Sequence, residues 1–350
     1  MLFSSKNAKY YMFTAVVVLI VSYFANKWKR VFDDNNDESN KLIQEYLLNE
    51  TPLYGHNRPK LWIHTTHEIN ARKWKDFYSR NTTDLNQPYV HLTIKTIINH
   101  CGNDFNVCLI DDESFSTLLP SWEINMSKTA EPMKSRYREL ALLQLIYIYG
   151  GMVVPNSFVC MKNMKEFYET NTEGDRPFVC ENINRHLDMK TEKQRKTFTP
   201  DTYIMGAEKN NQTIFYMAAF LKDKYKSPHL SNEYEFIGLT SQLCTSAIRG
   251  EQMNLVGGEM VGVKTNERKP ILLENLMEEE YLDLNRNAVG IYIPMNEILN
   301  RPKYQWFSVL PAQQILNSNM IISKYITASI VDTTDEYKKS TEIKSTVVRL

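Results

Sequence analysis

Polar and acidic side chains stand at the ends of three short, largely apolar runs in this chain. The runs cover residues 61–63, 105–110 and 152–154 and are typical of buried strands. The side chains at or just beyond their ends are His64, Asp111, Asp112, Asn156 and Ser157. Ligands of open α/β sheets bind at the carboxyl ends of strands, and carboxylates there suit a divalent cation or a ribose. The pattern therefore predicts a polar ligand site at one edge of a sheet.

A helix, a turn and a strand must position the last of these polar residues. Apolar residues spaced three and four apart up to residue 149 predict a helix that ends at Gly150 and Gly151. The two glycines supply the positive φ that the turn into the next strand needs. Residues 137–157 therefore form a predicted α/β unit, and Glu139 lies on its helix.

Residues 137–157 resemble a catalytic signature of the DXD-containing glycosyltransferases, in particular the glycosyltransferase 32 and capsular-polysaccharide-synthesis-like group. The pattern of that group is an acid, an arginine three residues later, two glycines, a strand and the motif D-x-D. Glu139 stands at the acidic position, but Leu142 stands at the arginine position. Residues 155–157, Pro-Asn-Ser, replace the D-x-D motif, so the chain resembles the scaffold and departs from its metal-binding acids.

Two upstream segments extend the resemblance. Residues 59–64, PKLWIH, are similar to the opening strand of the family, and residues 105–112 are similar to its second strand. The resemblance covers roughly residues 59–165.

The resemblance implies an α/β fold of the GT-A-like, Rossmann-like kind that binds a nucleotide sugar. It implies transfer of a sugar from this donor to a glycan or protein acceptor. The donor contacts that it implies are His64, Asp111, Asp112, Glu139, Asn156 and Ser157, with Gly150 and Gly151 as the structural turn. The cofactor of such enzymes is a divalent metal such as manganese, which binds carboxylates. Because the D-x-D acids are replaced, no residue is assigned to a metal and none to catalysis.

Two functional classes remain open at this stage. The first is a working glycosyltransferase in which Arg136 and Arg138 supply the positive charge that a metal would bring to the diphosphate. The second is a catalytically inactive glycosyltransferase-like protein that binds a glycan or a protein partner, which accounts for the residues at 155–157. Fold alone does not decide between them.

Each candidate residue also has a structural interpretation. Asp111 and Asp112 are placed to cap a following helix, and Glu139, Arg136 and Arg138 fit a solvated helix surface. His64 and His67 have a spacing that metals use, yet two residues three apart on a strand end point to opposite faces, which favours a structural role. Asp201 in a turn is typical of a residue that caps its own backbone, or it serves as an acceptor contact.

The chain carries 41 basic and 41 acidic residues among 350, and 43% of its residues are hydrophobic. This length and composition allow one large α/β domain or two modest ones. A balanced charge without a basic stripe argues against nucleic acid as a partner.

An uncharged segment near the amino terminus predicts a membrane anchor. Residues 10–25 carry no charge and are flanked by lysines, and roughly 17–25 residues suffice to span a bilayer. We expect a tail over residues 1–9, an anchor over 10–26, a polar stem over 27–58, a glycosyltransferase-like domain over 59–332 and a tail over 333–350. The resemblance implies a single-pass protein whose carboxyl-terminal body is lumenal or extracellular.

Five cysteines without a C-x-x-C motif leave the compartment open. Four N-x-S/T sequons begin at Asn49, Asn81, Asn125 and Asn211, and they are compatible with a lumenal body.

Overall fold

The computed structural model describes residues 58–65, 87–120, 122–184, 197–225 and 233–330. All of them belong to the unit Leu48–Leu350. The predicted anchor, the predicted tails and all of the stem but residue 58 lie outside the described residues, as does His67. Within the described ranges, no helix is both long and apolar enough to cross a membrane.

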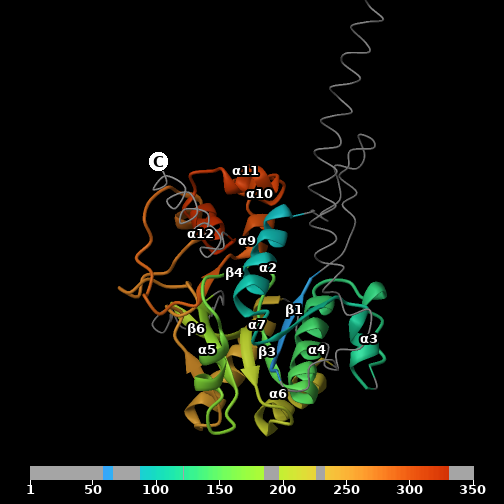
Figure 1. Cartoon of the computed structure of the whole chain (residues 1–350). Helices are drawn as coiled ribbons and strands as arrows, with labels where there is room; N and C mark the ends of the chain where they lie inside the picture. The colour runs from blue at the N-terminus through green and yellow to red at the C-terminus, as the bar shows by residue number, and fades with distance from the viewer. Residues whose placement is uncertain (1–57, 66–86, 121, 185–196, 226–232, 331–350) are drawn as a thin grey trace, which may run out of the picture. The chain divides into compact units, whose positions relative to one another are not determined.

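The core element is a six-stranded mixed sheet with the order β2-β1-β3-β6-β5-β7 (Figure 1). Its strands are β1 (Lys60–His64), β2 (Asn106–Ile110), β3 (Gly151–Val153), β5 (Phe178–Ile183), β6 (Phe198–Ala207) and β7 (Asn254–Val256). Strand β6 runs antiparallel to both β3 and β5, whereas β1 pairs in parallel with β2 and β3, and β5 with β7. The other five strands therefore share one direction, and the predicted α/β class is confirmed.

The register places the carboxyl ends of these five strands at one edge. Trp62 lies opposite Val153, and both Val153 and Val179 lie opposite Met205 of the antiparallel strand. On the other side, His64 lies opposite Ile110. Whatever follows these strands is therefore delivered to the same edge of the sheet.

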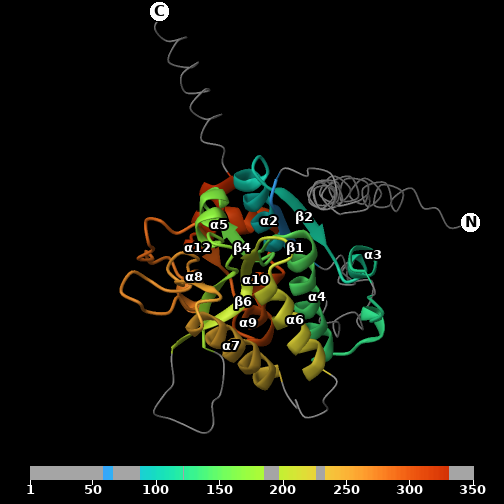
Figure 2. The same cartoon turned by 90° about the horizontal axis from the view of Figure 1, so that it is seen from below.

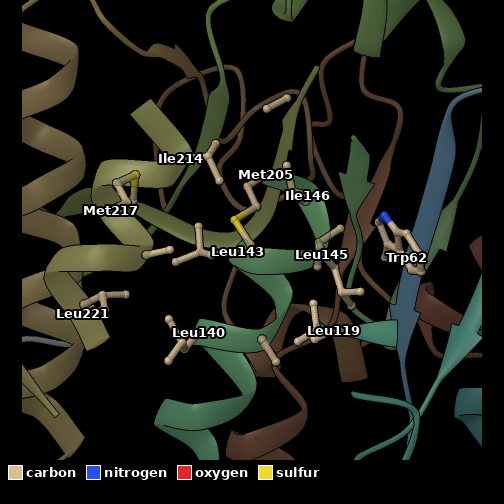
Figure 3. Packing of buried hydrophobic residues seen from close by; sticks show 14 of the residues in the cluster. Trp62, Leu119, Leu140, Leu143, Leu145, Ile146, Met205, Ile214, Met217 and Leu221 are labelled. Carbon is tan, nitrogen blue, oxygen red and sulfur yellow. The ribbon is translucent and has the colours of Figure 1, made fainter. Parts of the chain in front are cut away.

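Helices α4 (Met133–Tyr149), α6 (Gln212–Lys224) and α7 (Glu233–Arg249) cover one face of the sheet and lie next to one another in this order (Figure 2). Figure 3 shows the packing beneath them, a buried cluster that includes Leu143 of α4, Met205 of β6 and Met217 of α6. Burial of each such side chain stabilises the fold by about 1.5–3 kcal/mol. This core fixes α4, the helix that carries Glu139, against the sheet.

A second group of elements packs around the chain segment that follows β3. Here β4 (Phe158–Cys160) pairs antiparallel with β8 (Gly290–Tyr292), and α2 (Pro88–Cys101) packs against β4 and α12 (Ile321–Ile330). These two strands form a smaller sheet that is separate from the six-stranded one. The remaining helices are α3 (Ser114–Leu118), η2 (Met126–Lys128), α5 (Lys165–Asn171), α8 (Leu273–Met277), α9 (Met295–Asn300), α10 (Gln305–Ser308) and α11 (Ala312–Leu316).

The glycine turn between α4 and β3 is confirmed. Gly150 and Gly151 have φ of 70° and 95°, which only glycine adopts without strain. A Cβ on Gly151 would lie 2.1 Å from the carbonyl oxygen of Lys60. The indole nitrogen of Trp62 donates to the Gly150 carbonyl at 3.0 Å, so the turn is bonded to the central strand.

Candidate functional site

Asp112 lies at the centre of a charged cluster at the carboxyl ends of β1 and β2. Arg138 of α4 donates two hydrogen bonds to its carboxylate, from Nε to Oδ1 at 2.7 Å and from Nη2 to Oδ2 at 2.6 Å. The Nζ of Lys134 lies 3.3 Å from Oδ2, and His64 Nε2 lies 3.0 Å from Oδ1. We call His64, Asp112, Lys134 and Arg138 the Asp112 cluster.

The electrostatics of this cluster favour an ionised Asp112. Burial alone would raise the pKa of this carboxyl, but the hydrogen bonds from Arg138 and His64 outweigh it and hold the pKa well below its usual range. The Arg138 guanidinium also lies 3.4 Å from Glu131, whose side chain is mostly exposed. Asp112 therefore holds the edge of the Arg138 guanidinium that carries Nε and Nη2. The edge that faces Glu131 is partly exposed to solvent.

Asp111 caps the helix that follows it, which is one of the two roles that the sequence analysis gave it. Its Oδ1 accepts hydrogen bonds from the backbone N–H groups of Glu113 and Ser114, at 3.1 and 2.9 Å, and from the Ser114 hydroxyl at 2.7 Å. These bonds cap the first turn of α3. The two neighbouring aspartates thus differ in role, because Asp111 caps a helix and Asp112 forms ion pairs with basic side chains.

Glu139 is partly buried between α4, β6 and α7. The hydroxyl of Thr202 donates to its Oε1 at 2.6 Å, and Thr240 of α7 also hydrogen-bonds the carboxylate. Burial raises the pKa of Glu139 to about 7, the two threonines oppose this rise, and the negative charge of Asp201 adds to it. The interpretation of Glu139 as a solvated helix acid is therefore wrong.

Asp201 and its neighbours continue this polar region along β6 and β5. The amide of Asn182 donates to Asp201 Oδ2 at 2.8 Å, and the Tyr203 N–H donates to Oδ1 at 3.3 Å. Next to Asn182 in β5, Glu181 accepts a hydrogen bond from Lys264 Nζ, and the same Nζ lies 3.0 Å from Glu259 Oε2. Glu181 also accepts the N–H of Gly258 at 3.0 Å.

The segment that replaces the D-x-D motif is built into the fold. Asn156 and Ser157 are 9% and 1% exposed. The backbone oxygen of Asn156 accepts a hydrogen bond from Thr93 of α2, and the Ser157 hydroxyl donates to the Ile293 carbonyl at 2.8 Å. The segment is therefore bonded to α2 through the backbone of Asn156 and to the residue after β8 through the side chain of Ser157.

The residues present do not fit the divalent metal that the family resemblance implies. Pro155 has no side-chain ligand atom, its carbonyl accepts the Phe158 N–H, and the Ser157 hydroxyl is directed at a carbonyl. Across the described ranges, no three His, Cys, Asp or Glu side chains group closely enough to hold a metal ion. A hard divalent cation needs several oxygen ligands, which carboxylates usually provide.

Arg136 does not lie on a solvated helix surface, and this part of the sequence analysis is wrong. It is 3% exposed, its Nη1 lies 3.6 Å from Met133 Sδ, and its carbonyl accepts the Tyr225 hydroxyl at 2.9 Å. A signal was present in the sequence, because Leu140 and Leu143 follow Arg136 at spacings of four and seven and share its helix face.

Sequence reasoning missed Lys134, Thr202 and the ion pairs of Lys264. Lys134 lies one helical turn before Arg138, so its proximity was readable once Arg138 was placed. No local pattern marks Thr202 or Lys264, since their partners Glu139 and Glu181 are 63 and 83 residues away in sequence.

Comparison with known proteins gives no family for this chain. No protein-family model matches it, and no curated protein matches it. Among solved structures, PaToxG glycosyltransferase aligns with a TM-score of 0.33 at 12% identity, covering 63% of this chain and 79% of the other. The apo form of mouse xyloside xylosyltransferase 1 aligns with a TM-score of 0.39 at 10% identity, covering 68% and 98%.

A third structure is the galactosyltransferase LgtC in complex with donor and acceptor sugar analogues. It aligns with a TM-score of 0.37 at 9% identity, covering 80% of this chain and 99% of the other. All three are named glycosyltransferases, but likeness at this level does not transfer a family or an activity. The membership of the glycosyltransferase 32 group stays a prediction.

Proposed function

We propose that this chain is a membrane-anchored, glycosyltransferase-like protein that binds a nucleotide-sugar donor without a divalent metal. One observation carries the proposal. The carboxyl ends of five parallel strands meet at one edge, and the Asp112 cluster and Glu139 lie there. This edge is where open α/β sheets bind ligands. The resemblance of residues 59–165 to nucleotide-sugar enzymes supplies the ligand class.

Arg138 and Lys134 are the residues that we assign to the diphosphate of the donor. An arginine fork matches phosphate oxygens, and a lysine adds a compact positive charge. Asp112 holds the fork in place, while the contact of Arg138 with the mostly exposed Glu131 is long, at 3.4 Å. A phosphate can replace Glu131 at this position without breaking the bonds to Asp112. Arg136, which the sequence offered for the same role, is buried and is not assigned.

Glu139 is the residue that we assign to a sugar hydroxyl of the donor. Its carboxylate already accepts hydrogen bonds from Thr202 and Thr240, and it retains further acceptor positions. In a transfer reaction, the hydroxyl oxygen of the acceptor would bond to the anomeric carbon and release its proton to water, while the bond to the nucleotide diphosphate breaks. The diphosphate would leave with the electron pair beside Arg138 and Lys134, which stabilise its charge.

A second candidate is a protein that binds the donor, or a glycan, without transferring sugar. The observation that favours it is the burial of Asn156 and Ser157. Because these residues are buried, residues 155–157 serve to connect parts of the fold and are not available to a ligand. Loss of one strong interaction with the transition state typically lowers the rate by about 10²–10³-fold. Binding without turnover is the signature of this candidate.

Calorimetric titration with a panel of UDP- and GDP-sugars, with manganese and with EDTA, tests the proposal. We expect saturable binding that is the same in both conditions. Arg138→Ala should weaken it about tenfold or more, because a charge-assisted hydrogen bond contributes about 1.5–3 kcal/mol. Arg176→Ala is the matched control, since Arg176 is exposed on the loop that enters β5, at the opposite edge.

Release of free nucleotide, with and without candidate acceptors, then separates the two candidates. Turnover supports the transferase, and tight binding with no release supports the non-catalytic protein. No binding across the panel by a folded sample refutes a donor site at this edge. Binding that needs manganese refutes the assignment of the charge to Arg138 and Lys134.

A further inference from the structure

The structure distinguishes two of the four N-x-S/T sequons of this chain. Asn125 and Asn211 lie in the described residues, whereas Asn49 and Asn81 lie outside them. Both described asparagines begin a helical element, so sequence context does not separate them. The two asparagines differ in their burial and in the hydrogen bonds of their side chains.

Asn211 is built into the fold through the nitrogen that would carry a glycan. Its side chain is 3% exposed. Its Nδ2 donates to the Asp175 carbonyl at 2.6 Å and to Asp175 Oδ1 at 3.2 Å. Its Oδ1 caps α6 by accepting the N–H of Ile214 at 3.2 Å. A sugar on Nδ2 would remove a donor hydrogen and would need space that neighbouring atoms fill.

Among the described residues, the side chain of Asn125 makes its hydrogen bonds through its oxygen. Its Oδ1 accepts the N–H of Lys128 at 3.2 Å and the Ser127 hydroxyl at 2.7 Å, which caps η2. Asn125 and Ser127 are exposed, while Met126 between them is 4% exposed and anchors the turn. A glycosylated asparagine keeps its amide oxygen, so this cap survives attachment of a sugar to Nδ2. The folded domain can therefore carry a glycan at Asn125.

We propose that Asn125 is an N-glycosylation site and that Asn211 is not. The co-substrate is an oligosaccharide on a polyprenyl diphosphate. Nδ2 forms a bond to the anomeric carbon of the first sugar and loses one proton, and the polyprenyl diphosphate leaves with the electron pair. The inference rests on the membrane anchor of the proposed function and on the expectation, implied by the family resemblance, that the carboxyl-terminal body is lumenal or extracellular.

Single-sequon variants of the full chain, expressed in eukaryotic cells, test this inference. Each variant keeps one sequon and loses the hydroxyl residue of the other three, which leaves every asparagine cap in place. The substitutions, three per variant, come from Thr51→Ala, Thr83→Ala, Ser127→Ala and Thr213→Ala. The readout is electrophoretic mobility before and after treatment with peptide N-glycosidase.

We expect the variant that keeps the Asn125 sequon to migrate more slowly by the mass of one glycan, and the enzyme to remove this shift. The variant that keeps the Asn211 sequon should show no shift. The inference is overturned if the Asn125 variant shows no shift, or if the Asn211 variant does.

The Asn49 and Asn81 variants locate the cause of a failure. Both residues follow the predicted anchor, so each reports on which side of the membrane the body lies. A shift in either one, without a shift at Asn125, means that the body reaches the lumen and the assigned site is wrong. No shift in any variant means that the lumenal placement is wrong and the inference fails with it. Donor binding, measured by calorimetry, is independent of all these results.

Discussion

We expect Glu139 to make the stability of this domain fall as the solution changes from pH 5 to pH 8. The residue is partly buried, and its burial raises the pKa of its carboxyl from 4.5 to about 7. In the unfolded chain the same carboxyl titrates near its ordinary value. Between these two values the folded state therefore binds more protons than the unfolded state, and stability decreases with rising pH.

The size of the effect follows from the two pKa values. Each unit of pKa difference corresponds to about 1.4 kcal/mol, so the full change is about 3 kcal/mol. Near pH 5 most of this stabilisation is present, and near pH 8 almost none remains. The free energy of unfolding should therefore fall by about 2–2.5 kcal/mol over this interval. Above pH 8 the contribution of Glu139 is constant, because the carboxylate is ionised in both states.

Glu139→Gln removes this pH dependence. Glutamine stays neutral and keeps an oxygen that accepts the Thr202 hydroxyl. We expect the variant to match the wild type near pH 5 and to exceed its stability by about 2 kcal/mol at pH 8. Urea unfolding of the unit Leu48–Leu350, followed by circular dichroism at half-unit steps of pH, measures both curves.

A matched control separates Glu139 from the other titrating groups. Glu166 of α5 is exposed, so Glu166→Gln should leave the pH profile of the wild type unchanged. The reasoning is refuted if Glu139→Gln and the wild type show parallel profiles. In that case the environment of Glu139 solvates its charge in the folded protein.

Two further predictions concern the positioning of the site. Arg138→Ala should lower the free energy of unfolding by about 1–3 kcal/mol, because the partly buried carboxylate of Asp112 loses two charge-assisted hydrogen bonds. Arg138→Lys should recover less than half of this loss, since an ammonium does not reproduce the fork, and full recovery would contradict the geometry. Gly151→Ala should cost at least about 3 kcal/mol or prevent folding, because its Cβ meets the Lys60 carbonyl at a positive φ. Gly250→Ala, where the new Cβ has only ordinary contacts, should change stability by less than about 1 kcal/mol, and equal effects at both glycines would refute the steric argument.

The elements that local sequence specifies were predictable. The strands near residues 61, 107 and 152 are short apolar runs, and the helix before Gly150 has the spacing of a packed helix. The turn at Gly150 and Gly151 follows from glycine itself. These features depend on a few neighbouring residues, so one sequence is enough to recognise them.

Side-chain partners that are distant in sequence were not predictable. The sequence contains Asp112 and Arg138, but only the packing of α4 against the sheet brings the guanidinium to the carboxylate. The same packing places Glu139 against Thr202 of β6. Strand β6 runs antiparallel in the middle of the sheet, and no local pattern shows where such a strand inserts.

The absence of acids at residues 155–157 and the burial of this segment are connected. The segment joins β3 to β4, and hydrogen bonds fix its backbone to Thr93 and Ile293. A carboxylate in place of Ser157, which is 1% exposed, would be buried without a cation, and such a charge costs several kcal/mol. The structure therefore accommodates neutral residues here, and the charged groups at this edge come from β2 and α4 instead. For this reason the donor site that we propose takes its positive charge from Arg138 and Lys134 and not from a metal held at residues 155–157.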